Sequence, residues 1–221
     1  MLEARAICRN SREGRPLLRD VALKVDSGDR VAISGSTGAG KSLLLRALAL
    51  LDPIDSGDVC WQGTSVADRS VPEFRSRVMY VQQRPTLIEG TVEQNLRMPF
   101  ELRIHRRRSF ERDWFRKRLA DLQRVESFLE QDVTHLSGGE RQIVAVLRAL
   151  ALAPSILLLD EPTASLDADS VEQIELMIRN WHQKSPERAC VWVTHDVRQA
   201  ARMGSRRLRM EAGRLIETGT Q

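Results

Sequence analysis

The glycine-rich stretch Gly35–Ser42 constrains the fold of this chain more than any other feature. It fits the pattern G-x-x-x-x-G-K-[ST]; the apolar run Val31–Ile33 precedes it, and the strong helix former Leu43–Leu48 follows it. This order predicts a strand, a loop and a helix, with loop N–H groups and the positive end of the helix facing a phosphate. We therefore predict a phosphate-binding loop made of Gly35, Ser36, Thr37, Gly38, Ala39, Gly40, Lys41 and Ser42.

Two side chains of this loop carry the expected chemistry. Lys41 is placed to reach the β- and γ-phosphates of a nucleotide, and Ser42 is placed to set its hydroxyl on Mg²⁺. The alternative is a glycine-rich turn with a surface lysine, and the strand and helix on either side argue against it.

A second acidic element follows the apolar run Leu157–Leu159. Asp160, at the tip of this expected strand, is placed to hold Mg²⁺ through water, and Glu161 is placed to orient a water for attack on the γ-phosphate. Paired acids after a strand are often only a helix cap or a solvated turn. Beside a phosphate loop, we favour catalysis.

The stretch Leu136–Glu140 has two interpretations. Ser137 and Glu140 form a capping box that opens a helix over Arg141–Leu152. Gly138 and Gly139 also leave N–H groups directed outward, which suits a phosphate. One γ-phosphate does not need two such sites in one chain, so the second becomes useful when it closes over the nucleotide of a partner subunit.

The pattern of elements predicts an α/β fold. Buried-strand signals alternate with helices, which indicates a mainly parallel sheet with helices on both faces. Hairpins at both ends indicate an antiparallel sheet beside it, with Leu2–Cys8 as an edge strand paired with Val21–Val25. We expect a single domain over residues 1–221, with a helical lobe of its own inserted at roughly residues 84–153.

Composition narrows the class of protein. Apolar residues make up 42% and charged residues 29% of the 221 residues, and no apolar run approaches the ~18 residues of a membrane-spanning helix. Glu3 and Arg5 interrupt the first residues, so we expect no signal peptide. The chain has three cysteines, an odd number, and they lack metal-ligand spacing. We therefore expect buried thiols in a reducing cytosol at Cys8, Cys60 and Cys190.

The chain carries a net charge of +4 and has a pI near 9.3. This balance is compatible with a nucleic acid, an anionic membrane surface or an acidic partner, and does not choose among them. The most basic run holds Arg103, His105, Arg106, Arg107 and Arg108. It suits either a solvated loop between helices or a surface that docks onto an acidic partner or membrane.

Taken together, the motifs resemble the ATP-binding subunit of an ABC transporter, and the resemblance covers essentially the whole chain. Six motifs stand in family order. They are similar to Walker A (Gly35–Ser42), the Q-loop (Gln83), the signature (Leu136–Glu140, with Glu140 where glutamine is more usual), Walker B with the catalytic glutamate (Ile156–Glu161), the D-loop (Ser165–Asp167) and the switch histidine (His195).

This resemblance implies a P-loop NTPase of ABC type that hydrolyses ATP with Mg²⁺. It implies a head-to-tail homodimer that closes on two ATP molecules, each held by the Walker A loop of one chain and by Ser137, Gly138 and Gly139 of the other. Catalytic roles would fall to Glu161, His195 on the γ-phosphate, and Gln83, which would link Mg²⁺ and the attacking water to movement of the helical lobe. Metal contacts would come from Ser42, Gln83 and Asp160.

The resemblance also implies a separate integral-membrane permease and a cytoplasmic location, peripheral on the inner face of the cell membrane through that permease. No nucleic acid partner is expected. One departure stands out: the family usually stacks adenine on an aromatic residue of the first hairpin, where this chain has Arg9 and Asn10. Because a guanidinium plane can stack on a base, Arg9 is the candidate for contact with adenine.

Within the family, Pro85–Leu96, Pro99 and the basic run are similar to the bacterial FetA type, which is implicated in iron export. ATPases of amino-acid, phosphate and lipoprotein systems are closely related. The runner-up is a non-transport ABC ATPase of DNA repair, chromosome organisation or translation, which usually carries a coiled-coil insertion, zinc-binding cysteines or a second ATPase domain. A phosphate-loop kinase or small GTPase leaves Gln83 and Ser137–Glu140 unexplained.

Overall fold

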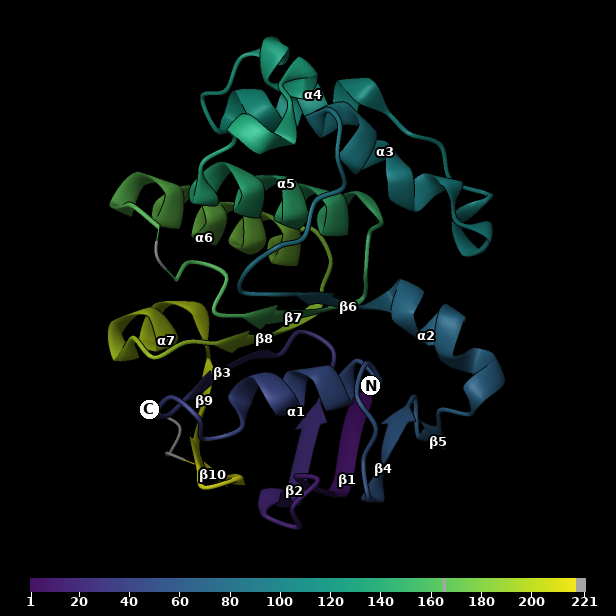
Figure 1. Ribbon diagram of the computed structural model, residues 1–221, viewed down its shortest axis with the longest axis vertical. Coiled ribbons are helices and arrows are strands. Elements are labelled where there is room, and N and C mark those ends of the chain that lie inside the picture. Colours follow the sequence, from purple (N-terminus) through teal and green to yellow (C-terminus); the bar gives the residue numbers. More distant parts are fainter. Residues whose placement is uncertain (165, 218–221) are drawn as a thin grey trace.

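A six-stranded sheet forms the centre of the computed structural model, which describes residues 1–164 and 166–217 (Figure 1). Its strand order is β10-β9-β3-β8-β7-β6, and all neighbours are parallel except β9 and β10. The mainly parallel core is therefore confirmed. The strands span Arg30–Ser34 (β3), Val78–Val81 (β6), Ile156–Asp160 (β7), Ala189–Val193 (β8), Arg206–Glu211 (β9) and Arg214–Glu217 (β10).

A four-stranded antiparallel sheet lies beside it, in the order β2-β1-β4-β5. The expectation of an edge strand at the start of the chain is wrong, because β4 pairs with the free side of β1, for example Trp61 with Leu2. The strands span Leu2–Asn10 (β1), Pro16–Val25 (β2), Ser56–Trp61 (β4) and Thr64–Ser65 (β5).

Helices cover both faces of the central sheet (Figure 1). Helix α1, Lys41–Leu48, lies between the two sheets, and α5 and α6, Gly138–Ala151 and Ala168–Gln183, lie on the opposite face. None of the helices in the described ranges has the length and apolar character needed to cross a membrane. The remaining helices are Val71–Arg77 (α2), Val92–Glu101 (α3), Arg112–Asp121 (α4) and Val197–Met203 (α7), with 3₁₀ turns at Asp68–Ser70 (η1), Arg103–His105 (η2), Glu126–Glu130 (η3) and Val133–His135 (η4).

The two faces of the sheet belong to two hydrophobic clusters. In β7, Leu157 and Leu159 join the cluster of α5 and α6, while Ile156 and Leu158 join the cluster of α1 and the antiparallel sheet. This alternation follows from the period of two in a β-strand. The β7 strand is therefore fully buried and holds its carboxyl end rigidly.

The helical segment from α3 to α5 shares its core with the sheet. Val92, Leu96 and Phe115 belong to the same cluster as Leu157 and Trp192. The expected lobe of its own stays a prediction, and the described segment shares its packing with the core through α5. The reason is that α5 is buried on nearly all sides and contacts both the sheet and the outer helices.

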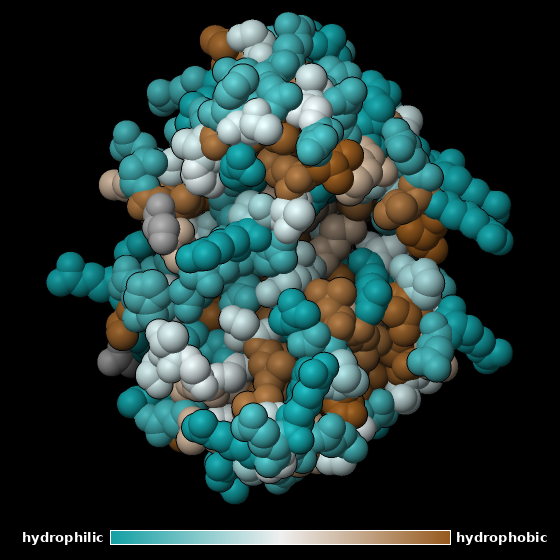
Figure 2. All heavy atoms as spheres, in the orientation of Figure 1, coloured by the Kyte–Doolittle hydropathy of each residue, from teal (hydrophilic) through white to brown (hydrophobic). Residues whose placement is uncertain are grey.

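A groove of about 300 Å³ runs beside β6 where the helical segment meets the sheet. Its walls include Arg75 of α2, Pro99 of α3, Arg148 of α5, and Tyr80 and Gln82. Figure 2 shows hydrophobic patches on the same side of the molecule, between its upper and lower parts.

Candidate functional site

The phosphate loop follows β3 and ends where α1 begins at Lys41. Gly35 and Gly40 have φ angles of 147° and 106°, a region that favours glycine. A Cβ atom at Gly35 would collide with the carbonyl oxygen of Met210, and one at Gly40 would lie 3.1 Å from the carbonyl oxygen of Leu17. The loop therefore needs glycine at both ends, and the first N–H groups of α1 stay open to an anion.

Lys41 lies against its own loop. Its side chain is 5% exposed, and Nζ donates to the carbonyl oxygens of Gly35 and Ser36 at 2.8 and 3.0 Å. Nζ is also 3.7 Å from Oε1 of Glu161. An ammonium group has three donors, so one N–H remains for a further acceptor in front of the loop.

Asp160 is held by two hydroxyl groups. Ser42 Oγ donates to its Oδ1 at 2.9 Å, and Tyr80 Oη donates to its Oδ2 at 2.7 Å. Asp160 is 3% exposed, and burial together with this carboxylate raises the pKa of Tyr80 well above its ordinary value. Tyr80 was missed as a site residue. The sequence feature that points to Tyr80 is its position in a buried strand. In the structure this strand, β6, lies beside β7, and Tyr80 pairs with Leu158, two residues before Asp160.

The donors beside the loop suit Mg²⁺. The ion prefers oxygen ligands and binds through one or two protein groups together with phosphates and water. Ser42 and Asp160 present a hydroxyl and a carboxylate that are 2.9 Å apart at the base of the phosphate loop. These residues fit Mg²⁺, which when bound would offset the charge of phosphate oxygens.

Glu161 is the point where the predicted catalytic residues meet. Its Oε2 lies 3.2 Å from Nδ1 of His195 and accepts a hydrogen bond from Nε2 of Gln83 at 3.5 Å, while Oε1 faces Lys41. Gln83, Glu161 and His195 follow the neighbouring strands β6, β7 and β8, and parallel strands end at one edge of a sheet. Topology therefore brings together residues that are far apart in the sequence.

The backbone of Glu161 is strained. Its φ of 43° is in the left-handed region, which costs a non-glycine residue about 1–3 kcal/mol. Its N–H donates to the carbonyl oxygen of Val193 at 3.0 Å, which ties the residue to the end of β8. The surrounding structure therefore fixes the direction of the carboxylate.

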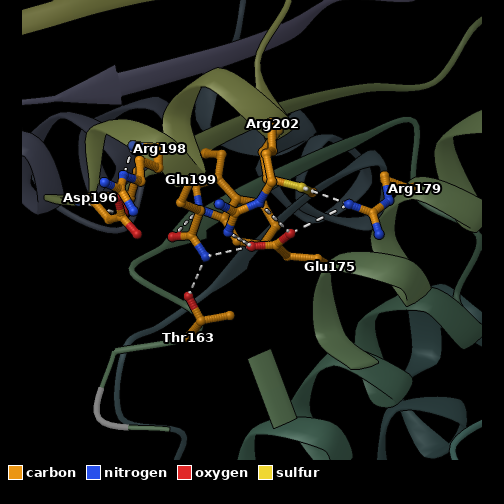
Figure 3. A network of polar contacts seen from close by, with 10 residues as sticks. Thr163, Glu175, Arg179, Asp196, Arg198, Gln199 and Arg202 are labelled. Carbon is orange, nitrogen blue, oxygen red and sulfur yellow. Dashed lines mark hydrogen bonds and ion pairs between the residues drawn. The ribbon is translucent and has the colours of Figure 1, made fainter. Parts of the chain in front are cut away.

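A polar network contacts the loop that follows Glu161, at Thr163 (Figure 3). Gln199 Nε2 donates to Thr163 Oγ1 at 2.8 Å and to Glu175 Oε1 at 2.9 Å, and Gln199 Oε1 accepts from the indole of Trp192. Arg202 forms two hydrogen bonds with Glu175, at 2.8 and 3.2 Å. The network joins the loop after Glu161 to α7, which follows His195, and to α6.

The network stabilises the charged form of the Glu175 carboxylate, which has ion pairs with both Arg179 and Arg202. Burial alone would raise the pKa of Glu175, and hydrogen bonds from Arg202 and Gln199 outweigh it, so the pKa lies below its ordinary value. The sequence gives no local motif for Thr163, Glu175 or Gln199, because their relation arises only when α6, α7 and the loop pack together.

The signature stretch begins α5, as its capping box predicts. Ser137 Oγ accepts from the N–H of Glu140 at 3.2 Å, and the Glu140 carboxylate accepts from the N–H of Ser137 at 2.9 Å. A Cβ atom at Gly138 would meet nothing within 4 Å, whereas Gly139 faces Ser170 of α6. Among residues 1–164 and 166–217, no hydrogen bond joins this stretch to the phosphate loop.

Two predicted contacts stand apart from this cluster. Asp167 caps α6, with its carboxylate accepting from the N–H and hydroxyl of Ser170, while Ser165 of the D-loop lies outside the described residues. Arg9 Nη1 forms an ion pair with Asp52 at 3.0 Å, beyond the C-terminal end of α1, whereas the phosphate loop is at its N-terminal end. Contact between Arg9 and adenine stays a prediction.

Comparison with known proteins gives a consistent result. The family model described as "ABC transporter" matches residues 18–164. The chain is 37% identical to the phosphate import ATP-binding protein PstB 2 of Natronomonas pharaonis over 94% of this chain and 76% of that protein. It is 36% identical to the sulfate/thiosulfate import ATP-binding protein cysA of Cucumis sativus over 92% of this chain, and spans 58% of that relative.

Solved structures share the fold over the whole chain. The dimeric ATP-binding cassette MJ0796, described in a post-hydrolysis state with ADP and Pi, has a TM-score of 0.84 and 27% identity, covering 100% of both chains. A bacterial Atm1-family ABC exporter with ATP bound has a TM-score of 0.82 and 28% identity, covering 98% of this chain and 38% of that one. Since the family match contains Lys41, Gln83, Asp160 and Glu161, the chain belongs to the ABC transporter family, as an ATP-hydrolysing, nucleotide-binding domain.

Proposed function

We propose that this chain hydrolyses ATP in a site shared between two copies and thereby powers a separate membrane permease. The observation that supports this most is the meeting of Lys41, Gln83 and His195 at the carboxylate of Glu161. A carboxylate so placed is a general base for a water that attacks the γ-phosphate. Lys41 and the open N–H groups of α1 would hold the phosphates, and His195 would contact the γ-phosphate.

The proposal of a shared site rests on the signature stretch. Gly138 is open to its surroundings, and α5 begins with N–H groups that its own phosphate loop does not use. A second chain in head-to-tail arrangement would place Ser137, Gly138 and Gly139 over the nucleotide of the first. The related cassette MJ0796 is described as dimeric, which supports this arrangement.

Glu161→Gln separates binding from chemistry. Glutamine keeps the side-chain size and hydrogen bonds, but it does not accept a proton at neutral pH. Turnover should fall by about 10²-fold or more, since general acid–base catalysis contributes typically 10²–10⁴-fold. Light scattering should show a dimer with ATP and a monomer without it. A variant that binds ATP and stays monomeric contradicts the shared site, and normal hydrolysis removes Glu161 from catalysis.

We propose that the groove beside β6 receives a short helix from the cytoplasmic face of the permease. The groove of about 300 Å³ includes Gln82, whose neighbour Gln83 bonds Glu161, so an occupant would lie one residue from the catalytic cluster. Gln142 of α5 donates to the carbonyl oxygen of Gln82 at 3.4 Å, which links α5 to the residue before Gln83. This supports coupling of the permease to hydrolysis through Gln83.

The transported cargo is proposed from the segment Pro85–Leu96. Its likeness to the FetA type supports metal export, with iron as the first cargo to test. The two sequence relatives compared above are described as import ATP-binding proteins, and one of the similar structures is described as an exporter. In the structure, the Asn95 side chain stabilises this segment. Its amide oxygen accepts from the N–H of Ile88, and its amide nitrogen donates to the carbonyl oxygen of Ile88.

Purification of the tagged chain from native membranes tests the permease. A co-purifying integral-membrane protein supports the transport function and identifies the partner. A coiled-coil protein or DNA in its place favours the runner-up, an ABC ATPase of DNA repair, chromosome organisation or translation. Loss of the membrane protein after Gln82→Arg, which adds bulk and charge to the groove, would locate the contact.

A further inference from the structure

We propose that the basic turn, defined as Leu102–Arg108, docks directly onto anionic lipid headgroups of the membrane. Three cations project from this turn. Arg103, Arg106 and Arg107 are exposed, and none of them has a side-chain hydrogen bond or ion pair with the part of the chain that the structure describes. The charges are therefore free for a partner.

Arginines of the neighbouring helix α4, in contrast, form ion pairs within the chain. Arg112 contacts Glu93, Glu126 and Glu130, and Arg116 contacts Asp113 and Glu126. The arginines of α4 are thus neutralised by carboxylates within the chain. The basic turn, by contrast, has three arginines that form no ion pair with a carboxylate of the described residues.

The turn is held in place from inside. His105 is 4% exposed, and the Arg108 guanidinium donates to the carbonyl oxygen of Leu152 at the end of α5. Backbone hydrogen bonds from the N–H of His105 to the carbonyl oxygen of Leu102, and from the N–H of Arg108 to that of His105, close the turn. Two side chains anchor it, and the other three arginines face outward, so less conformational entropy is lost on docking.

Exposed aliphatic side chains alternate with the free cations. Leu102 is 54% and Ile104 is 45% exposed. Figure 2 shows long hydrophilic side chains beside hydrophobic ones at the right-hand edge, where η2 lies in Figure 1. Basic residues mixed with exposed aliphatic ones favour the boundary between headgroups and acyl chains, where both kinds of side chain find partners.

An open recess of about 730 Å³ lies between the basic turn and α2. Arg77 of α2 adds a cation to its wall, and Glu73 is the one carboxylate among the described residues that line it. The recess therefore has room for a phosphate headgroup with cations on two sides. Several N–H donors around one phosphate give charge-assisted hydrogen bonds.

Charge favours lipid over a protein partner. Cytoplasmic loops of membrane proteins carry an excess of Lys and Arg, which would repel the basic turn, whereas the cytoplasmic leaflet is anionic and attracts it. Arg75 of α2 lines the groove proposed for the permease, and Arg77 of the same helix lines the recess. The two surfaces therefore adjoin the same short helix. Lipid binding does not itself require the permease.

Vesicle sedimentation of the full chain, without permease, tests the proposal. Binding should be strong to phosphatidylcholine vesicles that contain phosphatidylglycerol, weak to phosphatidylcholine alone, and weakened by salt. Replacing Arg103, Arg106 and Arg107 by Ser should weaken partition on the order of a hundred-fold, given the contribution of each cation near an anionic surface. The matched control removes the same charge from the first hairpin, at Arg12, Arg15 and Arg19, which are exposed and should be dispensable.

A second variant tests the aliphatic contribution. Leu102→Ser with Ile104→Ser keeps every charge and should weaken partition by about ten-fold through lost apolar burial. All variants should keep the soluble ATPase rate, which confirms folding, because none of these residues contacts the catalytic cluster. Equal loss in the control triple variant, or equal binding to neutral vesicles, overturns the proposal. Loss of permease binding in detergent, with vesicle binding intact, would instead assign the turn to an acidic protein.

Discussion

At the scale of single residues, the contact between Tyr80 and Asp160 makes the first prediction. Tyr80→Phe keeps the ring and removes the hydroxyl that donates to a carboxylate only 3% exposed. The free energy of unfolding should fall by about 1.5–3 kcal/mol, the contribution of a hydrogen bond to a charged group. Urea unfolding in the absence of nucleotide measures it. In an Asp160→Asn background the loss should shrink, and an equal loss in both backgrounds would contradict the assigned contact.

Arg9 makes a second prediction at this scale. If its guanidinium stacks on adenine, Arg9→Ala should weaken ATP and ADP alike, by about 1–3 kcal/mol as for base–aromatic stacking. Arg46→Ala is the matched control, because Arg46 also bonds Asp52 but lies on α1. Calorimetric titration with both nucleotides measures the affinities. Unchanged affinity after Arg9→Ala would limit this residue to its ion pair with Asp52.

At the scale of elements, Gln199 of α7 ties the loop after Glu161 to the helix that follows His195. Gln199→Ala removes the bonds to Thr163 and Glu175, so the loop after Glu161 loses its tie to α7. Turnover should fall by about ten- to a hundred-fold from misplacement of catalytic groups, with ATP affinity unchanged. Steady-state kinetics and nucleotide titration together measure this.

The control for this prediction is Arg198→Ala, at a neighbouring exposed position whose hydrogen bond to Asp196 is made by its backbone N–H. It should keep the wild-type rate. Gln199→Glu should be more harmful than Gln199→Ala, because it sets a second carboxylate against Glu175 in a buried site. A Gln199→Glu protein with full activity would show that the network serves stability alone.

Elements with a strong local signal could be predicted from the sequence. The β7 strand, Ile156–Asp160, contains the predicted apolar run and ends at Asp160 as predicted, and the capping box of Ser137 and Glu140 starts α5 as expected. What depends on neighbours could not be predicted. The place of β1 inside its sheet requires β4, and the contact of Tyr80 with Asp160 requires the register of β6 on β7.

At the scale of the whole molecule, the shared site predicts complementation between two inactive chains. Lys41→Ala damages the phosphate loop, and Gly139→Asp places a carboxylate at the start of α5. In a mixed dimer, one nucleotide would meet an intact loop from one chain and an intact signature from the other. Mixing the two proteins should therefore restore roughly a quarter of wild-type turnover, because about half of randomly paired dimers are mixed and each keeps one of two sites.

Titration of one inactive protein into the other, followed by phosphate release, measures this recovery. Each protein alone should remain inactive at every concentration. A mixture that stays inactive while forming dimers would show that a single chain supplies its whole site.

The order of strands in the central sheet has a consequence for how the chain folds. The phosphate-loop strand β3 is flanked by β8 and β9, and Val31 pairs with Val191 on one side and Arg206 on the other. During synthesis β3 therefore emerges long before either partner and keeps two unpaired edges, which favour aggregation. Such distant pairings slow folding, because the long loop must close before its contacts form. The nucleotide site is among the last parts of the nascent chain to form, and chaperones that shield strand edges should matter most for this stage.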